Sequence, residues 1–447
     1  MVINWLVSCK KTPKIIFEHL KSELFSLEII DKFRVSEKDF TRVRKQTFSN
    51  TLLFMMNFLR KSLSLEIENF VKHVCSLKES KLISAFSKSA FGQCRNKIKP
   101  AVFVHLNQTL VREFYTDNDD SVKLWNGFRL LAIDGSRLTL PSTEELKNYY
   151  GETKNQTNTG VVQARVSVLY DVLNKYVLDG ILSPLSEGEV ASAINHLEHT
   201  KPKDLVIYDR GYPSFRLIFE HYFKSVDFVI RAKKDFNNEI IDFYASDLKS
   251  KIVKIYPGKN TKISDKPYDY KTFKTVRLIR VPLPNGEDEI LITSLLDTKK
   301  YPSAIFKTLY FKRWSIETFY DEFKTKLKVE NFSGYSKHSI LQDFYAALFV
   351  SNIQTMLVEE INQELRNNTK TKYIYKVNNN LSYGFLKDRI VTLFFSNTDT
   401  DEILSELKQL LKKHLIPIRP DRKFERYKDK YRNRQKPKVT KNQKDSL

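Results

Sequence analysis

The sequence predicts an α/β fold with a mixed-sheet core, an all-β insertion and helical regions at both ends. First, apolar residues recur at helical spacing through residues 1–125. Second, strand and helix patterns alternate over residues 126–232 in the order strand, hairpin, helix, strand, helix, strand, which requires some parallel pairing. Third, short alternating strands broken by Pro, Gly and Asp fill residues 233–303.

Residues 1–125 are expected to be helical, because segments such as NTLLFMMNFLRKSLSLEIENFVKHV are long, periodic and free of Gly and Pro. Further along, a turn near Ser87 to Ser89 joins two predicted short helices. The second of these helices carries Gln93, Arg95, Asn96 and Lys97. This pattern fits a helix-turn-helix that enters a DNA major groove, and it also fits an ordinary helical hairpin whose basic residues face water.

Residues 126–232 supply the first part of the core. An apolar run ends at Asp134, and two strands surround a turn near Asn174. A helix is expected over residues 189–200. The following segment, DLVIYD, is a short and wholly apolar strand that ends in Asp209, as expected of a buried strand.

Residues 304–370 supply the second part of the core. No Gly or Pro occurs from Ala304 to Ser333, so a single helix is expected to include Tyr310–Leu327. Another long helix should cover residues 339–365. Residues 371–447 are expected to form a helical C-terminal region that ends in a basic tail with few apolar residues.

One face of the helix expected over Tyr310–Leu327 carries polar residues at regular spacing. At about 100° per residue, four side chains fall within an arc of about 60°, namely Tyr310, Arg313, Glu317 and Lys324. A neighbouring arc is apolar and wide enough to face a core. The polar arc is therefore predicted to be a binding surface. The alternative is a solvated face with ordinary ion pairs.

Two aspartates end apolar strands, Asp134 in LLAID and Asp209 in LVIYD. If these strands are neighbours about 4.8 Å apart, their carboxylates meet at one end of the sheet, and Glu317 can pack above them. Three such carboxylates repel one another unless a cation lies among them, and oxygen ligands suit Mg²⁺ or Mn²⁺. Asp321, one turn beyond Glu317, is an alternative third ligand. An Asp after a strand is also commonly a turn or cap residue.

Such a site fits phosphodiester chemistry. Two metal ions about 4 Å apart can activate a water or a 3′-hydroxyl and stabilise the leaving oxygen. Arg313 and Lys324 would hold phosphates beside them, and Tyr310 would stack on a base or donate to a phosphate. His196 and His199 also have metal-like spacing, but no other Cys or His lies near them in the sequence, so we expect both to be surface residues.

The formal net charge of +22 argues for a polyanionic partner, either nucleic acid or an anionic membrane surface. No apolar run approaches the roughly 20 residues that a membrane span needs, so DNA is the expected partner. Cys9, Cys75 and Cys94 are widely spaced without a C-x-x-C pair, which argues against a zinc site or a disulfide framework and for a reducing cytoplasm. The N-terminus also lacks the basic region of a secretion signal.

This combination resembles the DDE transposases of bacterial insertion sequences, in particular the insertion sequence 4 family. Members of that family carry a Tyr, two residues, Arg, three residues, Glu, six residues and Lys. The residues here with the same spacing are Tyr310, Arg313, Glu317 and Lys324. The first two acids of the family resemble Asp134 in AIDGS and Asp209 in YDRGY. The likeness extends to QARVSVLYDVLN, to FSKSAFGQCRNKI and to the basic tail, and so covers most of the chain.

The resemblance implies an RNase H-like catalytic core, residues 126–232 and 304–370, with the β-rich insertion at 233–303 between its parts. Residues 1–125 would form an N-terminal DNA-binding region, and residues 371–447 would form the C-terminal region. It also implies cut-and-paste transposition with two divalent metal ions, Mg²⁺ or, as the alternative, Mn²⁺. The implied partners are double-stranded transposon ends with terminal inverted repeats, target DNA, and a second protomer in a homodimer that holds the two ends together.

The resemblance further implies a role for each site residue. Asp134, Asp209 and Glu317 would bind the metal ions. The other three residues of the spaced motif, which we define as Tyr310, Arg313, Glu317 and Lys324, would contact DNA near the cleaved end. Some members place a Trp before a strand of the insertion, where it stacks on a flipped base. The matching residue here is Glu289, so base flipping and a hairpin intermediate remain open. Two alternatives also stay open, a transposase-derived protein that binds DNA without cutting it and another RNase H-like nuclease.

Overall fold

The computed structural model describes residues 12–42, 44, 46–77, 85–116, 121–154, 160–259, 261, 263–264, 266–283, 286–367, 373–396 and 398–419. The expected basic tail lies outside the described residues from residue 420 onward. The chain divides into two compact units. The first, the sheet unit, comprises Ile98–Lys324 and Val329–Asn352, and the second, the helical unit, comprises Thr12–Lys97, Thr325–Lys328 and Ile353–Leu447.

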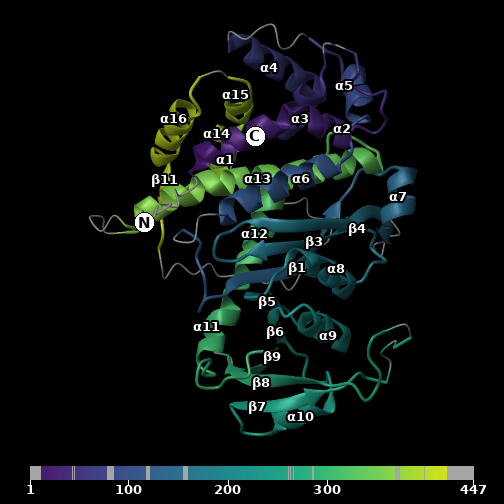
Figure 1. The fold of residues 1–447 in the computed structure, drawn as a ribbon, viewed down its shortest axis with the longest axis vertical. Coiled ribbons are helices and arrows are strands. Elements are labelled where there is room, and N and C mark those ends of the chain that lie inside the picture. Colours follow the sequence, from purple (N-terminus) through teal and green to yellow (C-terminus); the bar gives the residue numbers. More distant parts are fainter. Residues whose placement is uncertain are drawn as a thin grey trace, which may run out of the picture. The chain divides into compact units, whose positions relative to one another are not determined.

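A mixed sheet forms the centre of the sheet unit (Figure 1). Its strands in the described residues are β1 (Arg129–Thr139), β2 (Glu152–Lys154), β3 (Gly160–Asp171), β4 (Val177–Ser183), β5 (Asp204–Tyr208), β6 (Asp227–Arg231), β7 (Ser250–Ile255), β8 (Lys274–Pro282) and β9 (Asp288–Thr293). They lie in the order β2-β3-β1-β5-β6-β9-β8-β7, with β4 paired to β3.

Within this sheet, β1 pairs in parallel with β5, and β5 with β6, whereas the other described pairings are antiparallel. The prediction of an α/β fold with a mixed sheet is therefore confirmed. The order β4-β3-β1-β5-β6, three antiparallel strands followed by two parallel ones, is that of an RNase H-like core.

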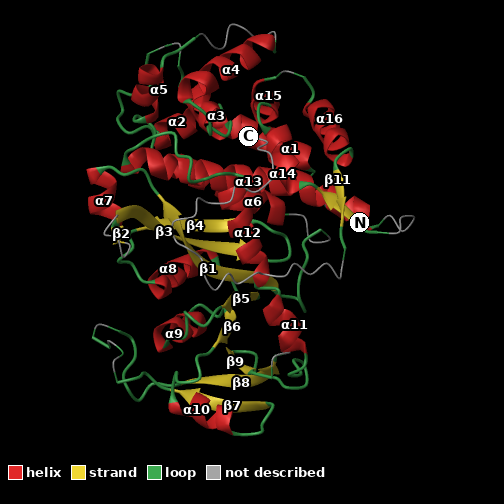
Figure 2. Ribbon diagram, turned by 180° about the vertical axis from the view of Figure 1, so that it is seen from behind, coloured by secondary structure: helices red, strands yellow, loops and turns green. Residues whose placement is uncertain are grey.

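Helices cover both faces of this sheet (Figure 2). Those of the sheet unit are α6 (Ala101–Tyr115), α7 (Glu144–Tyr150), α8 (Glu189–His196), α9 (Phe215–Phe223), α10 (Asn238–Ala245), α11 (Ile305–Phe311), α12 (Trp314–Thr325) and the part of α13 (Lys337–Arg366) up to Asn352. His196 of α8 contacts Ser167 of β3, whereas Phe319 of α12 stacks on Tyr170 at 5.2 Å between ring centroids. Because residues 167 and 170 point to opposite faces of a strand, α8 and α12 lie on opposite sides of the sheet.

Residues 233–303 continue the same sheet through β7, β8 and β9, and β9 pairs with β6 of the core. Helix α10 interrupts the all-β pattern expected for this segment. The side chain of Asn237 accepts a hydrogen bond from the Ile240 amide and caps the helix. Such a cap is a local signal for the start of a helix, and here it lies within a segment whose residues otherwise follow a strand pattern.

The single helix expected over Tyr310–Leu327 is broken into α11 and α12 at residues 312 and 313. Here the amides of residues 312, 313, 315 and 316 donate to carbonyls three positions earlier, so the turn is tighter than an α-helix. No Gly or Pro marks the break. We attribute the break to the tertiary contacts of the Arg313 side chain. Helix propensity, which depends only on the local sequence, does not predict such contacts.

Helices from both ends of the chain form the helical unit. They are α1 (Pro13–Leu24), α2 (Leu27–Phe33), α3 (Phe48–Met56), α4 (Leu63–Ser76), α5 (Lys88–Arg95), α14 (Asn379–Leu386), α15 (Arg389–Phe395) and α16 (Thr400–Lys412). A short antiparallel pair, β10 (Tyr375–Val377) and β11 (Leu415–Pro417), accompanies them. Phe17 packs against Phe394, and Lys387 donates to the buried Glu66 carboxylate, so both ends share one core.

The helix-turn-helix expectation meets the described residues only in part. Helix α5 begins at Lys88, where the second short helix was expected, and Ser87 caps it. Residues 81–84 of the first short helix lie outside the described residues, and residues 85–87 are not helical. None of the described helices is long and apolar enough to cross a membrane.

We predict that Asp204→Ala destabilises the protein by roughly 3–5 kcal/mol, because it leaves the guanidinium of Arg129 buried without its partner. Asp204 is fully buried and accepts hydrogen bonds from Arg129 at 2.8 and 2.6 Å. Urea-induced unfolding measures the change. Glu198→Ala is the control, because it removes an exposed ion pair with Lys224 and should leave the midpoint almost unchanged. Equal midpoints for the two variants would contradict the prediction.

Candidate active site

Asp134 lies within β1, just beyond the point where β1 stops pairing with its parallel neighbour β5, and Asp209 directly follows β5. The expectation that Asp134 ends its strand is wrong, because pairing with β3 carries β1 on to Thr139. In the register of β1 with β5, Ala132 is opposite Ile207, and each aspartate follows two positions later in the chain. The condition set by the sequence argument, that the two strands be neighbours, is therefore met. Backbone amides orient both side chains, since Gly135 donates to Asp134 Oδ1 at 2.9 Å and Gly211 donates to Asp209 Oδ1 at 2.7 Å.

Helix α12 brings Glu317 to the same edge through Arg313. One guanidinium nitrogen of Arg313, Nη1, is 3.5 Å from Asp134 Oδ2, and the other, Nη2, donates to Glu317 Oε1 at 2.6 Å. The hydroxyl of Tyr320 donates to the main-chain oxygen of Asp134 at 2.8 Å and fastens α12 to β1. These contacts favour Glu317 as the third acid over the alternative, Asp321, which is exposed.

The environment of Asp134 makes its negative charge unfavourable. Burial is the main cause that raises the pKa of this carboxyl to about 6, with smaller contributions from the charges of Asp209 and Glu317, and the Gly135 amide and Arg313 oppose this rise. The three carboxylates therefore act on one another electrostatically. Such mutual repulsion is relieved by a cation among them.

The other two residues of the spaced motif lie beside these acids. Tyr310 is 6% exposed, and burial raises the pKa of its hydroxyl to about 12. That hydroxyl has no hydrogen-bond partner among the described residues. Lys324 Nζ donates to Ser136 Oγ at 2.6 Å and to the carbonyl of Arg137 at 2.7 Å, next to Asp134 in β1. Burial lowers the pKa of the Lys324 ammonium.

A fourth carboxylate, Glu189 at the start of α8, lies at the same edge and was missed by the sequence reasoning. It binds Arg165 at 2.5 Å. A Cβ atom added to Gly135 would be 3.5 Å from Glu189 Oε1, and one added to Gly211 would be 3.3 Å from Oε2 and only 3.0 Å from Asp209 Oδ1. A Glu in the first turn is common in helices of every function, so no sequence signal distinguished it.

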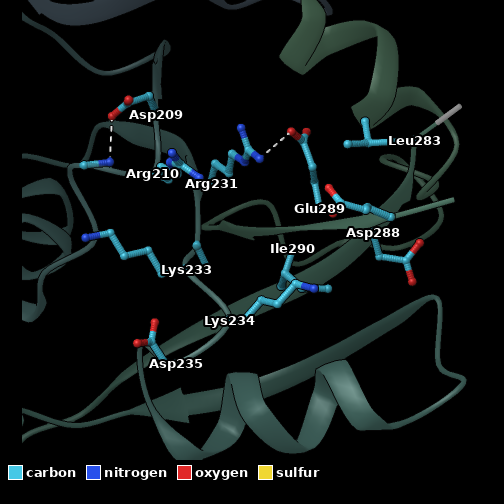
Figure 3. Close-up of a pocket in the computed structure, with 13 residues that line it drawn as sticks. Asp209, Arg210, Arg231, Lys233, Lys234, Asp235, Leu283, Asp288, Glu289 and Ile290 are labelled. Carbon is cyan, nitrogen blue, oxygen red and sulfur yellow. Dashed lines mark hydrogen bonds and ion pairs between the residues drawn. The ribbon is translucent and has the colours of Figure 1, made fainter. Parts of the chain in front are cut away.

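A cavity of about 560 Å³ adjoins Asp209 (Figure 3). Arg210, Lys233 and Lys234 line it, together with the ion pair of Arg231 and Glu289 at 3.0 Å. Arg210 and Lys233 are exposed and form no ion pair or side-chain hydrogen bond within the described residues. Glu289, the residue that the sequence resemblance matched to a Trp, is thus a partner of Arg231 on the cavity wall.

The two histidines with metal-like spacing have structural contacts. The expectation of a surface position is wrong for His196, which is fully buried, with Nδ1 2.7 Å from Asp179 and Nε2 3.0 Å from Ser167. His199 is partly exposed, with Nε2 3.7 Å from the same carboxylate. A polar side chain can be buried when partners satisfy it, and the spacing alone did not reveal those partners.

The acids at the edge of the sheet offer the right donors for a hard divalent cation, because they are all carboxylate oxygens. The guanidinium of Arg313 already stands between Asp134 and Glu317 as a cation. No three His, Cys, Asp or Glu side chains of the described residues are grouped closely enough to hold a metal ion together. The donor chemistry thus fits Mg²⁺ or Mn²⁺, and ion binding requires these side chains to draw closer.

Comparison with known proteins gives matches of three kinds. Residues 125–353, just over half of the chain, match a family described as the transposase DDE domain. The Escherichia coli (strain K12) protein named "Putative transposase InsZ" is 25% identical over 170 residues, which are 36% of this chain and 54% of that protein. The chain therefore spans about half the length of that relative. A cryo-EM structure of the piggyBac transposase synaptic complex with hairpin DNA aligns with a TM-score of 0.42 and 10% identity, over 90% of this chain and 85% of that one.

We predict that Asp134→Asn stabilises the metal-free protein at pH 7 by up to about 3 kcal/mol. The pKa of Asp134 rises from 3.8 to about 6 in the fold, so between these pH values the native state binds more protons than the unfolded state. Wild-type stability should therefore fall as pH rises through this window, and the neutral amide escapes that loss.

Urea titrations from pH 4 to pH 7 in chelator-treated buffer measure the difference between wild type and Asp134→Asn. The two curves should coincide near pH 4 and separate as the pH rises to 7. A constant difference across the range would show that the substitution acts through packing rather than through charge.

Proposed function

The chain belongs to the transposase DDE domain family, and we propose that it cuts DNA at transposon ends and transfers the released ends into target DNA. The observation that supports the proposal is that Asp134 is connected to each of the other two acids, Asp209 and Glu317. Parallel pairing aligns Asp134 with Asp209, and Arg313 joins Asp134 to Glu317. In this proposal the transposon is a bacterial insertion sequence, and its transposase is of the kind that carries the motif formed here by Tyr310, Arg313, Glu317 and Lys324. The protein acts in the cytoplasm on double-stranded DNA.

In the proposed mechanism Asp134, Asp209 and Glu317 would hold two divalent ions, Mg²⁺ or Mn²⁺. When bound, these ions supply activation of the attacking oxygen and stabilisation of the leaving oxygen. The carboxylates orient the site from rigid strands and a helix, which favours a precise geometry. Their backbone hydrogen bonds from Gly135 and Gly211 keep the two aspartates turned toward the edge of the sheet.

Arg313 has a second part in this proposal. Its guanidinium holds Asp134 and Glu317 as long as no other cation is among them. The planar fork of the same guanidinium would also be able to bind a phosphate of the DNA. Lys324 would contribute a point charge at the same strand, and the unpartnered hydroxyl of Tyr310 would donate to a phosphate oxygen.

The cavity beside Asp209 would receive DNA that flanks the cleaved bond. Arg210 and Lys233 are exposed cations on its wall, as phosphate contacts require. A homodimer would hold the two terminal inverted repeats together. Under this proposal the N-terminal region, residues 1–125, contributes DNA contacts outside the catalytic core.

A second candidate function is DNA binding without cleavage by a protein derived from a transposase. The position of Arg313 between two acids, together with the lack of a compact metal-binding group among the described residues, favours it. The two candidates differ in one measurement. Supercoiled plasmid carrying the DNA that flanks the gene on both sides is cut in the presence of Mg²⁺ only if the protein is an active transposase.

We predict that Asp134→Asn abolishes this cleavage and leaves DNA binding nearly intact, because the amide removes a ligand charge without changing the shape of the site. Plasmid nicking and electrophoretic mobility shift measure the two properties. Asp242→Asn, which alters an exposed acid of α10, is the control and should retain both. Full cleavage by Asp134→Asn would exclude Asp134 as a metal ligand.

We predict that Lys324→Ala weakens end binding or strand transfer by roughly tenfold to a hundredfold, as expected for loss of a charged hydrogen bond to phosphate. The melting temperature should change little. Lys307→Ala removes an exposed charge from α11 and serves as the control. A large loss of thermal stability in Lys324→Ala with normal transfer would assign the residue to folding, through its bonds to Ser136 and Arg137.

A further inference from the structure

The helical unit contains a basic cavity lined by its own residues. It has a volume of about 470 Å³ and is lined by residues between α2 and α3 and by residues at and just beyond the end of α5. Its charged lining residues are all cationic, namely Lys38, Arg42, Arg44 and Lys97. We propose that this cavity binds a nucleotide segment of transposon-end DNA. This inference rests on the proposed function, and it names a second place where the chain grips its substrate.

The cations around the cavity are available to a ligand. Lys38, Arg42 and Arg44 are exposed, and their side chains form no ion pair or hydrogen bond within the part of the chain that the structure describes. Lys97 has only a distant partner, Asp39, at 3.7 Å. Elsewhere in the same unit a lysine such as Lys387 is bound to a carboxylate at 2.9 Å. A cluster of unpaired cations at one concave site attracts a polyanion.

A buried amide on the same wall points to a ligand that forms hydrogen bonds. Gln46 lines the cavity and is 5% exposed. Neither its side-chain nitrogen nor its side-chain oxygen has a hydrogen-bond partner among the described residues. A buried amide without partners is unfavourable, and native proteins retain few of them. A nucleotide supplies acceptors in its phosphate and donors in the amino groups of its base, so both atoms of the amide would be satisfied.

The backbone beside the cavity is held in an uncommon conformation. Phe40 has φ of +59°, in the left-handed region, and its ring packs edge-on against Phe48 at 5.3 Å. Both rings line the cavity. Residues other than Gly rarely adopt this backbone conformation, and such strain is found preferentially at functional sites. Here it shapes the segment that presents Arg42 and Arg44.

The residues available for DNA contacts differ from those expected for a helix-turn-helix. Among the residues assigned there to a groove-reading helix, Arg95 is buried, with its guanidinium 5.2 Å from the Phe91 ring centre. Gln93 donates to Ser89 within its own helix. Lys97, in contrast, lines the cavity. DNA is preferred to a membrane surface as the ligand because the cavity is concave and its amide requires directional partners.

The test uses the full-length protein without divalent ions, so that binding is measured apart from cleavage. A labelled duplex that carries the inverted repeat is titrated at several salt concentrations. Arg42→Ala combined with Arg44→Ala should reduce affinity by about tenfold at 0.2 M salt and make the slope of log K against log salt shallower by about 1.8. Lys72→Ala combined with Lys413→Ala removes two exposed charges of the same unit outside the cavity and should change the slope little.

Gln46→Leu separates binding from folding. It removes the unpartnered amide at similar volume, so the melting temperature should stay the same or rise, while DNA affinity falls several-fold. Unchanged DNA affinity in Gln46→Leu, or equal losses in the two double variants, would overturn the proposal. So would a double variant that loses binding to phosphatidylserine vesicles and keeps its binding to DNA.

Failure of this inference and failure of the proposed function give different results. If wild-type protein does not cut DNA with Mg²⁺ but the Arg42 and Arg44 substitutions still weaken DNA binding, the cavity stands and the catalytic proposal falls. If cleavage occurs and the substitutions leave DNA binding unchanged, the cavity falls and the catalytic proposal stands.

Discussion

The parallel pairing of β1 with β5 is the constraint on which the rest of the site depends. Both strands run in the same direction and their pairing ends at Ala132 and Ile207, so Asp134 and Asp209, each two residues later, follow the same end of this pairing. The buried ion pair of Arg129 and Asp204 joins the first residues of the same two strands, which are also register partners. A slip in that register would separate the aspartates, so a contact far from the acids helps to align them.

The charge at the edge of the sheet is balanced by the protein itself. A buried carboxylate such as Asp134 is unfavourable next to other acids, and Arg313 offsets this repulsion from the tight turn between α11 and α12. Because guanidinium remains protonated in proteins, the pH dependence of this pair comes from Asp134, whose pKa is raised to about 6. In the proposed mechanism the same residue would bind a phosphate of the DNA, which would link the acids to the substrate.

The sequence predicted those features that depend on pattern. The apolar runs before Asp134 and Asp209 marked two buried strands, and the spacing from Tyr310 to Lys324 placed Glu317 on the side of α12 that faces Arg313 and the acids. The features it missed depend on contacts between distant residues. Glu189 approaches the acids only because α8 packs on the sheet, and the buried position of His196 depends on Asp179 and Ser167. The break at residue 313 likewise has no local signal, because neither Gly nor Pro is present there.

The shared core of the helical unit has a consequence for synthesis of the chain. Glu66 accepts a hydrogen bond from Lys387, 321 residues later in the chain. Asn57 donates one to Asp388, 331 residues later. A ribosome that adds roughly 5–20 residues per second needs about 15–60 s to span that distance. The early helices must therefore wait, without their final partners, while the whole sheet unit is translated and can fold. A product truncated before residue 387 would lack those partners, so this architecture couples a complete helical unit to translation of nearly the whole described chain.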